Sequence, residues 1–368
     1  MSRLAVINDQ HLFSGTSTQI YRIFQNLKKQ GNECGFYQFL VNSNGVEVLG
    51  DIQPVYGYFS KFPVNSKTIY DLKLAINFLT GRNWKQFKRI DADVAILSGP
   101  TLLPLSSYFK VTIVEGHDLY FIYERNREGV LGTYMRMMYK QFDDANQIIV
   151  NSDFTKKEFI KELGISPNKI SIVYRAVDSS IFHPGESDIR LKLHLDKKSK
   201  LLLSVGGDNP NKNIETIIRL LKSLPNEYVL LRVGRNFYTE KLVDDLGLKT
   251  RVIFLGNVSE SFLAELYRGC DILLFPSIFE GFGIPVIEAL SSGLPCLVSN
   301  RTALPEILGD AGILCEPYDL DCWKNSIIDL MTDETLYKTK SEKGIRRASF
   351  FSMENQYSAL KSVIDNLE

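Results

Sequence analysis

Two glutamates eight positions apart frame a short stretch that suits a hydroxyl-rich ligand. Glu280 and Glu288 begin and end the sequence Glu-Gly-Phe-Gly-Ile-Pro-Val-Ile-Glu. Carboxylates accept hydrogen bonds from hydroxyl groups, and the two glycines let the backbone approach a ligand closely. Pro285 suits the first turn of a helix, whose free N–H groups favour a phosphate or sugar oxygen. The spacing therefore favours a sugar or ribose site, although acidic residues at a helix start can also serve only the helix dipole.

A lysine before another predicted helix could neutralise phosphate. Lys212 follows an apolar run over 201–205 and precedes a helical pattern over 214–224. A cation at such a strand-to-helix turn can stabilise a departing diphosphate. Taken alone, a lysine in this position is more often solvated.

A histidine follows a strand pattern nearer the N-terminus. His117 comes after the apolar run over 111–114, in Val-Glu-Gly-His-Asp-Leu. At the carboxyl end of a parallel strand it could reach a ligand. An isolated histidine is also common as a structural hydrogen-bonding group, and the residues alone leave both interpretations open.

Alternating strand and helix patterns must position these residues. Short apolar runs alternate with segments of helical period, and the alternation restarts after an interruption around 178–198. Continuous β-branched runs between helices are typical of parallel sheets covered on both faces. We therefore expect an α/β fold with two Rossmann-like, doubly wound domains. Strands are predicted over 4–7, 36–41, 94–97, 111–114, 148–150, 170–174, 201–205, 229–233, 252–255, 272–275 and 296–298.

Composition and charge exclude several broad classes. The chain has 368 residues, of which 43 are basic, 43 are acidic and 44% are hydrophobic. These values are typical of a globular protein of about two domains and exclude a disordered or coiled-coil chain. Zero net charge argues against a nucleic-acid binder. The five scattered cysteines indicate reduced, buried thiols and not a disulfide framework or a zinc site. With no leader pattern and no long apolar run, a cytoplasmic protein is expected.

The stretch around the two glutamates resembles the E-x7-E signature of retaining GT-B glycosyltransferases of group 1. The similarity continues through Phe-Pro-Ser at 275–277, Gly-Leu-Pro at 293–295 and Leu-Pro-Glu-Ile-Leu-Gly-Asp-Ala-Gly at 304–312. It covers most of the chain and is strongest between 201 and 320. The resemblance implies GT-B architecture, with two domains facing across a cleft. It also implies a nucleotide-diphosphate sugar as donor, and transfer to a hydroxyl group with retention at the anomeric carbon.

The same resemblance implies roles for individual residues. Glu280 would hold donor-sugar hydroxyls, Glu288 would bind the ribose, and Lys212 would neutralise the diphosphate. His117 would reach the donor sugar. Further donor contacts, largely through the backbone, are expected from Gly15, Gly207, Gly281, Phe282, Gly283, Ile284 and Val258.

One position departs from the family pattern. The family usually carries arginine where this chain has Gly207, which puts one expected diphosphate contact in question. Arg235, after the strand expected over 229–233, is a candidate substitute. The departure motivates an alternative function, a catalytically weak nucleotide-sugar-binding pseudo-transferase or partner subunit. Another GT-B activity, an epimerase or a phosphorylase, is a second alternative.

No metal or cofactor is expected, because the family usually needs none and the nucleotide sugar is a co-substrate. Asp91 and Asp93 form a D-x-D pair of the kind that holds Mg²⁺ in the other major glycosyltransferase fold. They precede the strand expected over 94–97 and therefore lie at the wrong end of a parallel sheet for a ligand. We interpret them as a turn.

The resemblance also divides the chain by function. It implies an acceptor-side domain over 1–181, a donor domain over 182–350 and a last helix over 351–368 that packs back on the first domain. The stretch 61–90 carries seven basic residues and one acidic residue, interleaved with aromatic ones. Such a stretch can lie on an anionic membrane, although a solvated basic helix face is the alternative. We expect a glycan or lipid-linked acceptor, with peripheral membrane contact through 61–90 as the hypothesis to test.

Overall fold

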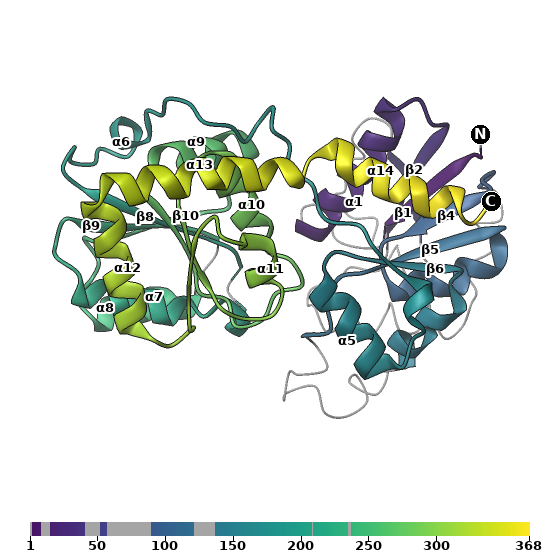
Figure 1. The fold of residues 1–368 in the computed structure, drawn as a ribbon, viewed down its shortest axis with the longest axis horizontal. Coiled ribbons are helices and arrows are strands. Elements are labelled where there is room, and N and C mark those ends of the chain that lie inside the picture. Colours follow the sequence, from purple (N-terminus) through teal and green to yellow (C-terminus); the bar gives the residue numbers. More distant parts are fainter. Residues whose placement is uncertain are drawn as a thin grey trace. The chain divides into compact units, whose positions relative to one another are not determined.

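The computed structural model describes residues 2–8, 15–40, 52–56, 90–120, 137–207, 209–234 and 237–368. The chain forms two compact units (Figure 1). The first unit combines Met1–Tyr174 with Gln356–Glu368, and the second is Arg175–Asn355. The chain therefore crosses from one unit to the other after Tyr174 and returns after Asn355.

Parallel strands build the sheet of the first unit in the order β3-β2-β1-β4-β5-β6-β7. Their apolar runs are buried along the whole length of β1 and β4, as expected for strands covered on both faces. Leu4 aligns with Cys34 on one side and with Val94 on the other. The strands are β1 (Leu4–Asn8), β2 (Cys34–Leu40), β3 (Ile52–Tyr56), β4 (Val94–Leu97), β5 (Val111–Gly116), β6 (Gln147–Val150) and β7 (Ile170–Ile172).

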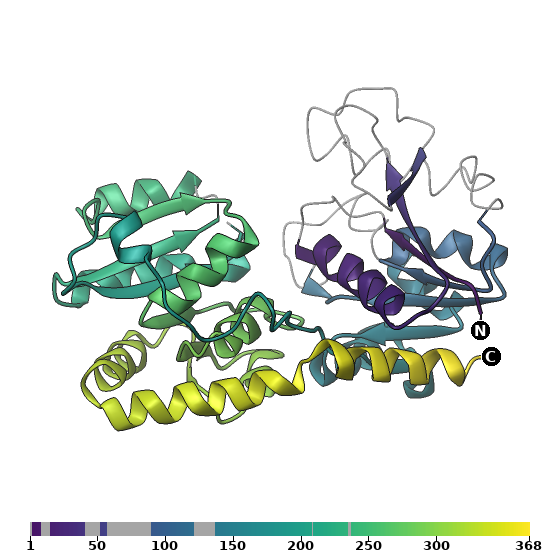
Figure 2. The same cartoon turned by 90° about the horizontal axis from the view of Figure 1, so that it is seen from above.

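Alternate residues of these strands enter two cores, one on each face of the sheet. Val6 packs with Phe24 of α1 and Leu360 of α14 on one face, whereas Ile7 packs with Phe159 of α5 on the other. Figure 2 shows α14 in yellow alongside the strands of the first unit. The helices are α1 (Gly15–Lys29), η2 (Pro100–Tyr108), η3 (Gln141–Asp144), α5 (Asp153–Leu163), η4 (Pro167–Lys169) and α14 (Met353–Asp365).

The second unit has its own parallel sheet in the order β10-β9-β8-β11-β12-β13. Residues of α7 and α12 pack on one face, where Ile217 and Trp323 meet Leu202 and Leu274. Its strands are β8 (Lys200–Val205), β9 (Tyr228–Val233), β10 (Val252–Gly256), β11 (Ile272–Phe275), β12 (Cys296–Ser299) and β13 (Ile313–Cys315). Its helices are α6 (Ile189–Lys192), η5 (Pro210–Lys212), α7 (Ile214–Ser223), α8 (Phe237–Asp245), α9 (Glu260–Gly269), α10 (Ile284–Ser291), α11 (Leu304–Leu308), α12 (Leu320–Thr332) and α13 (Glu334–Phe350).

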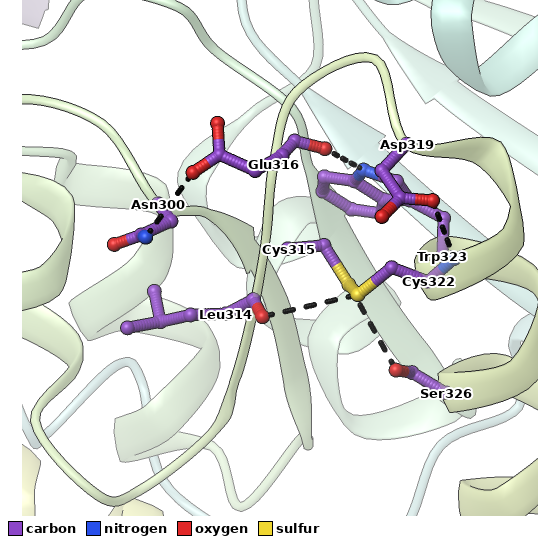
Figure 3. Close-up of a disulfide and its surroundings, with 8 residues drawn as sticks. All are labelled: Asn300, Leu314, Cys315, Glu316, Asp319, Cys322, Trp323 and Ser326. Atoms are coloured by element: carbon purple, nitrogen blue, oxygen red, sulfur yellow. Dashed lines mark hydrogen bonds between the residues drawn. A yellow bond between two sulfur atoms is a disulfide. The ribbon is translucent and has the colours of Figure 1, made fainter.

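The prediction that all five cysteines are reduced is wrong for one pair. Cys315 and Cys322 form a disulfide (Figure 3). Cys315 ends β13 and Cys322 lies in the first turn of α12, and this strand-to-helix turn brings positions seven apart to a Cα–Cα distance of 5.9 Å. Asp319 caps the helix by accepting a hydrogen bond from the Cys322 amide at 3.0 Å. A search for close Cys-x-x-Cys spacing misses such a pair.

The two aspartates of the D-x-D pair are engaged at the amino end of β4. The Arg3 amide donates to Asp93 at 3.1 Å, and the Arg3 guanidinium pairs with Asp91. Both carboxylates therefore hold the chain that enters β1 and β4.

Candidate active site

An ion pair joins two of the predicted site residues at the carboxyl edge of the second sheet. Lys212 ends the short turn after β8, and Glu280 lies in the loop between β11 and α10. The Lys212 Nζ lies 2.6 Å from the Glu280 Oε1, and the two side chains are only 19% and 12% exposed. Partial burial strengthens the attraction between unlike charges because solvent screening is reduced. The edge thus holds a paired cation and carboxylate where parallel sheets bind ligands.

Asparagines on either side of Lys212 tie its turn to the neighbouring loop. Asn211 donates through its side chain to the Phe279 carbonyl at 2.9 Å, and its own carbonyl accepts from the Ile278 amide at 2.7 Å. Asn213 donates to the carbonyls of Pro276 and Pro317, both at 3.2 Å. These residues fix the position of Lys212, and sequence reasoning missed them.

The backbone of Glu280 is held by a separate contact. The Glu280 amide donates to the Thr302 hydroxyl at 3.0 Å. Thr302 has a φ of 53°, a left-handed conformation that is uncommon for a β-branched residue. This strained residue, in the loop after β12, therefore anchors the backbone of Glu280.

Glu288 lies one turn inside α10 and is nearly buried. Its Oε2 accepts a hydrogen bond from the Tyr267 hydroxyl of α9 at 3.0 Å. Burial raises the pKa of Tyr267 well above its usual value, and the nearby Glu288 charge raises it further. The phenol therefore stays protonated and orients the carboxylate. Tyr267 is a second residue that sequence reasoning missed.

The start of α10 is shaped by a glycine that no other residue can replace without strain. Gly283 has a φ of 105°, and a Cβ there would lie 2.8 Å from a methyl group of Leu304. Phe282 is 3% exposed and packs edge-to-face on Phe351. Its side chain belongs to the core, so only its backbone can face a ligand. Gly281 precedes it in the loop, and Ile284 begins the helix.

The loop after β8 has room at the position where the family usually carries arginine. A Cβ at Gly207 would meet no atom within 4 Å. Gly206 packs against the Lys212 side chain, with an ideal Cβ 3.7 Å from its Cδ. Val258 lies in the loop after β10. Arg235, the predicted substitute for the missing arginine, lies outside the described residues.

His117 belongs to the first unit and follows β5. Its Nε2 hydrogen-bonds the Ser98 carbonyl at 2.7 Å, and its Nδ1 lies 4.0 Å from the buried Glu115 carboxylate. A carbonyl only accepts, so Nε2 carries the proton. Gly15, the other predicted donor contact in this unit, begins α1. The basic stretch 61–90 lies outside the described residues except for its last residue.

Several solved structures share this fold. Sucrose-phosphate synthase from Thermosynechococcus elongatus aligns with a TM-score of 0.85 at 18% identity, over 100% of this chain and 99% of that one. WaaG, a glycosyltransferase involved in lipopolysaccharide biosynthesis, aligns with a TM-score of 0.77 at 20% identity over 99% of each chain. Anabaena HepE, solved in complex with UDP-glucose, aligns at 0.78 and 16% identity over 100% of each chain. The fold is therefore the two-domain α/β architecture of the GT-B class, and this prediction is confirmed.

Two family profiles define the chain more narrowly. Residues 13–181 match Glycosyltransferase Family 4, and residues 186–347 match Glycosyl transferases group 1. Residues 186–347 are therefore a group 1 glycosyltransferase domain, as the E-x7-E stretch predicted, and residues 13–181 are a Family 4 glycosyltransferase domain.

Curated relatives carry names of the same kind. O-antigen chain mannosyltransferase B from Escherichia coli is 29% identical over 230 residues, which cover 60% of each protein. O-antigen chain mannosyltransferase RfbU from Salmonella typhimurium is 33% identical over 199 residues, covering 53% of this chain and 54% of that protein. D-inositol 3-phosphate glycosyltransferase from Mycobacterium marinum is 29% identical over 59% of this chain and 49% of that protein. The chain thus spans about half to three-fifths of the length of these relatives.

Proposed function

We propose that this protein is a retaining glycosyltransferase that moves a sugar from a nucleotide-diphosphate sugar to a hydroxyl group of a glycan or lipid-linked acceptor. The main support is the ion pair at the carboxyl edge of the second sheet, where the Lys212 Nζ lies 2.6 Å from the Glu280 Oε1. A cation for a diphosphate and a carboxylate for sugar hydroxyls are two groups that such a donor needs. The mannosyltransferase names of two curated relatives support the same activity.

Donor binding exchanges the partners of this ion pair. The diphosphate takes Lys212, and the released Glu280 accepts hydrogen bonds from the sugar hydroxyls. Glu288, oriented by Tyr267, accepts from the ribose, and the first N–H groups of α10 face anionic or polar oxygens. As the anomeric C–O bond breaks, Lys212 stabilises the charge on the diphosphate. The acceptor oxygen forms the new bond on the same face, and its proton passes to the leaving phosphate.

Donor screening followed by turnover tests the proposal. We expect one of the UDP-, GDP- or ADP-sugars to raise the melting temperature, because a ligand that binds only the folded state stabilises it. That donor should be hydrolysed or transferred, and Glu280→Ala should abolish the reaction. Stabilisation without turnover in the wild type would instead favour the pseudo-transferase, and no stabilisation by any nucleotide sugar would contradict both.

We also propose that transfer proceeds without a divalent metal. Within the residues that the structure describes, no group of three His, Cys, Asp or Glu side chains is arranged to hold a metal ion. Equal turnover with and without EDTA is the expected result. A loss that Mg²⁺ restores would overturn this part of the proposal.

Peripheral membrane contact through 61–90 is the part of the proposal that concerns the acceptor. It is supported by the seven basic residues and one acidic residue of this stretch. In the described part of the chain, no helix is both long and apolar enough to cross a membrane. We expect co-sedimentation with vesicles that contain anionic lipid, weakened by salt. Equal sedimentation with and without such vesicles would contradict it.

A further inference from the structure

Arg232 is a charged residue inside an otherwise apolar strand. It lies in β9, whose sequence is Tyr-Val-Leu-Leu-Arg-Val, and its side chain is completely buried. Burying a guanidinium is costly unless its N–H groups are bonded. An aliphatic residue would serve packing alone, so the position of the charged group needs a specific explanation.

The Arg232 guanidinium donates to backbone carbonyls at the carboxyl edge of the sheet. Its Nη2 donates to the carbonyl oxygens of Gly206 at 2.8 Å and Gly207 at 2.9 Å, and its Nη1 donates to that of Val233 at 2.7 Å. Gly206 and Gly207 directly follow β8. Arg232 of β9 therefore holds the loop that connects β8 to Lys212.

Two neighbouring glycines make this arrangement possible. A Cβ at Gly234 would lie 1.9 Å from the Gly206 carbonyl oxygen, so only glycine allows that carbonyl to approach. The C=O and N–H of a planar trans peptide point in opposite directions. The inward Gly206 carbonyl therefore turns the Gly207 N–H away from Arg232, on the loop where Gly206 packs against the Lys212 side chain.

We infer that Arg232 is a positioning residue for the diphosphate of the donor. It turns the carbonyls of Gly206 and Gly207 inward and presents the Gly207 N–H to a phosphate oxygen. These carbonyls in turn satisfy N–H groups of the buried guanidinium. Arg232 thus orders the loop at the position where the family usually carries an arginine. This inference rests on the proposed function.

The chain offers a matched control in Arg251, another largely buried arginine of the same sheet. Its guanidinium also donates to carbonyls, those of Tyr228 at 3.1 Å and Pro225 at 2.8 Å, but at the amino edge. The experiment measures the dissociation constants of a nucleoside diphosphate and of the monophosphate with the same base. It compares the full-length wild type with the Arg232→Met, Arg232→Lys and Arg251→Met variants.

We expect Arg232→Met to weaken diphosphate binding roughly tenfold or more, in line with the loss of hydrogen bonds to a charged group. Monophosphate binding should change much less, and Arg232→Lys should recover part of the loss. Arg251→Met should lower the melting temperature and leave the ratio of the two affinities unchanged. Equal weakening of both ligands by Arg232→Met would indicate a merely structural role and overturn the inference. A wild type that binds neither nucleotide would instead refute the proposed function.

A second variant keeps the inference testable if Arg232→Met fails to fold. Gly207→Arg places the family's usual residue where a Cβ meets no atom within 4 Å. In the Arg232→Lys background it should restore diphosphate affinity through a direct contact, whereas in the wild type it should add little because the Gly207 loop is already ordered for the phosphate. Equal gains in both backgrounds would show that the two positions act independently and would contradict the inference.

Discussion

The two edges of the second sheet each carry an ion pair, and the two pairs differ in what they hold. At the amino edge, the Asp271 carboxylate accepts hydrogen bonds from the Leu201 amide at 2.6 Å and from Arg190 at 2.9 Å. Arg190 also donates to the Ser199 carbonyl. These bonds complete the backbone pairing where β8 begins. The amino-edge pair is therefore part of the sheet.

The carboxyl-edge pair of Lys212 and Glu280 joins two loops that other residues already hold. Asn211 and Asn213 fix the turn of Lys212, and Thr302 holds the backbone of Glu280. A ligand can therefore bind either charged group while the backbone pairing of the sheet stays intact. Both pairs combine a cation with a carboxylate, at 2.9 Å and 2.6 Å. The comparison teaches that the position on the sheet and the engagement of backbone groups separate a structural ion pair from one suited to binding.

The largest effect should come from Glu280→Gln. This substitution keeps the size of the side chain but removes the charge, and with it the strongest acceptor for sugar hydroxyls. We expect kcat to fall by roughly 10²–10³-fold, as for other groups aimed at developing charge, with little change in the melting temperature. Turnover with the preferred nucleotide sugar measures it.

The amino edge provides the control for this prediction. Asp271→Asn should leave kcat per folded molecule within about twofold of the wild type, because hydrogen bonds at the start of β8 do not reach the substrate. If both substitutions lowered kcat equally, the distinction between the two edges would be lost.

Lys212→Met should weaken binding of a nucleoside diphosphate by roughly 10–100-fold. The variant loses a charge-assisted contact and leaves Glu280 to repel the phosphates. The double variant Lys212→Met/Glu280→Gln should therefore bind the diphosphate better than Lys212→Met alone. Calorimetric titration of the three proteins tests this order of affinities. The reverse order would show that Glu280 does not approach the diphosphate.

Most strands of the two sheets could be predicted from the sequence, because parallel strands covered on both faces have continuous apolar sequences. The runs over 94–97 and 272–275 match β4 and β11 residue for residue. The prediction omitted β3 and β13, because β3 contains Pro54 and β13 is only three residues long. Both are edge strands, where the sequence signal is weakest.

The site was only partly predictable. Long motifs identified Lys212 and Glu280, but no local pattern says that the two side chains meet, since they lie 68 positions apart. Tyr267 could not be found because its contact with Glu288 depends on the packing of α9 against α10. Arg232 was a signal that the sequence offered. The run over 229–233 was interpreted as an apolar strand, and the charged residue within it was not considered.

Asp271→Asn should lower the free energy of unfolding by about 1–3 kcal/mol, the cost of weakening bonds to a partly buried carboxylate. Its partner Arg190 keeps its charge and loses its counterion. Urea denaturation measures the loss, and Glu280→Gln serves as the comparison. A larger loss of stability in Glu280→Gln than in Asp271→Asn would reverse the assignment of the two edges.

Reducing the Cys315–Cys322 disulfide should lower stability by about 2 kcal/mol, because the loop that it closes is short. The other described cysteines are free and should not respond. A Cys315→Ser/Cys322→Ser variant should lose its sensitivity to dithiothreitol. Turnover should change little, since Asn213 bonds Pro276 as well as Pro317 of the closed loop. A reductant effect that persists in the serine variant would contradict this prediction.

Tyr267→Phe should have the smallest effect on binding, a roughly three- to tenfold weaker affinity for the nucleotide, because Glu288 loses one hydrogen bond. The same substitution also changes how the free energy of unfolding depends on pH. The pKa of Tyr267 is raised above its ordinary value, so the folded protein keeps the proton while the unfolded chain releases it above about pH 10. The resulting stability is present below that pH and is lost as the pH rises further. Urea unfolding between about pH 9 and 11 should therefore show a steeper loss in the wild type than in Tyr267→Phe. Parallel pH profiles would mean that Tyr267 does not hold its proton, and the orientation of Glu288 would then need another explanation.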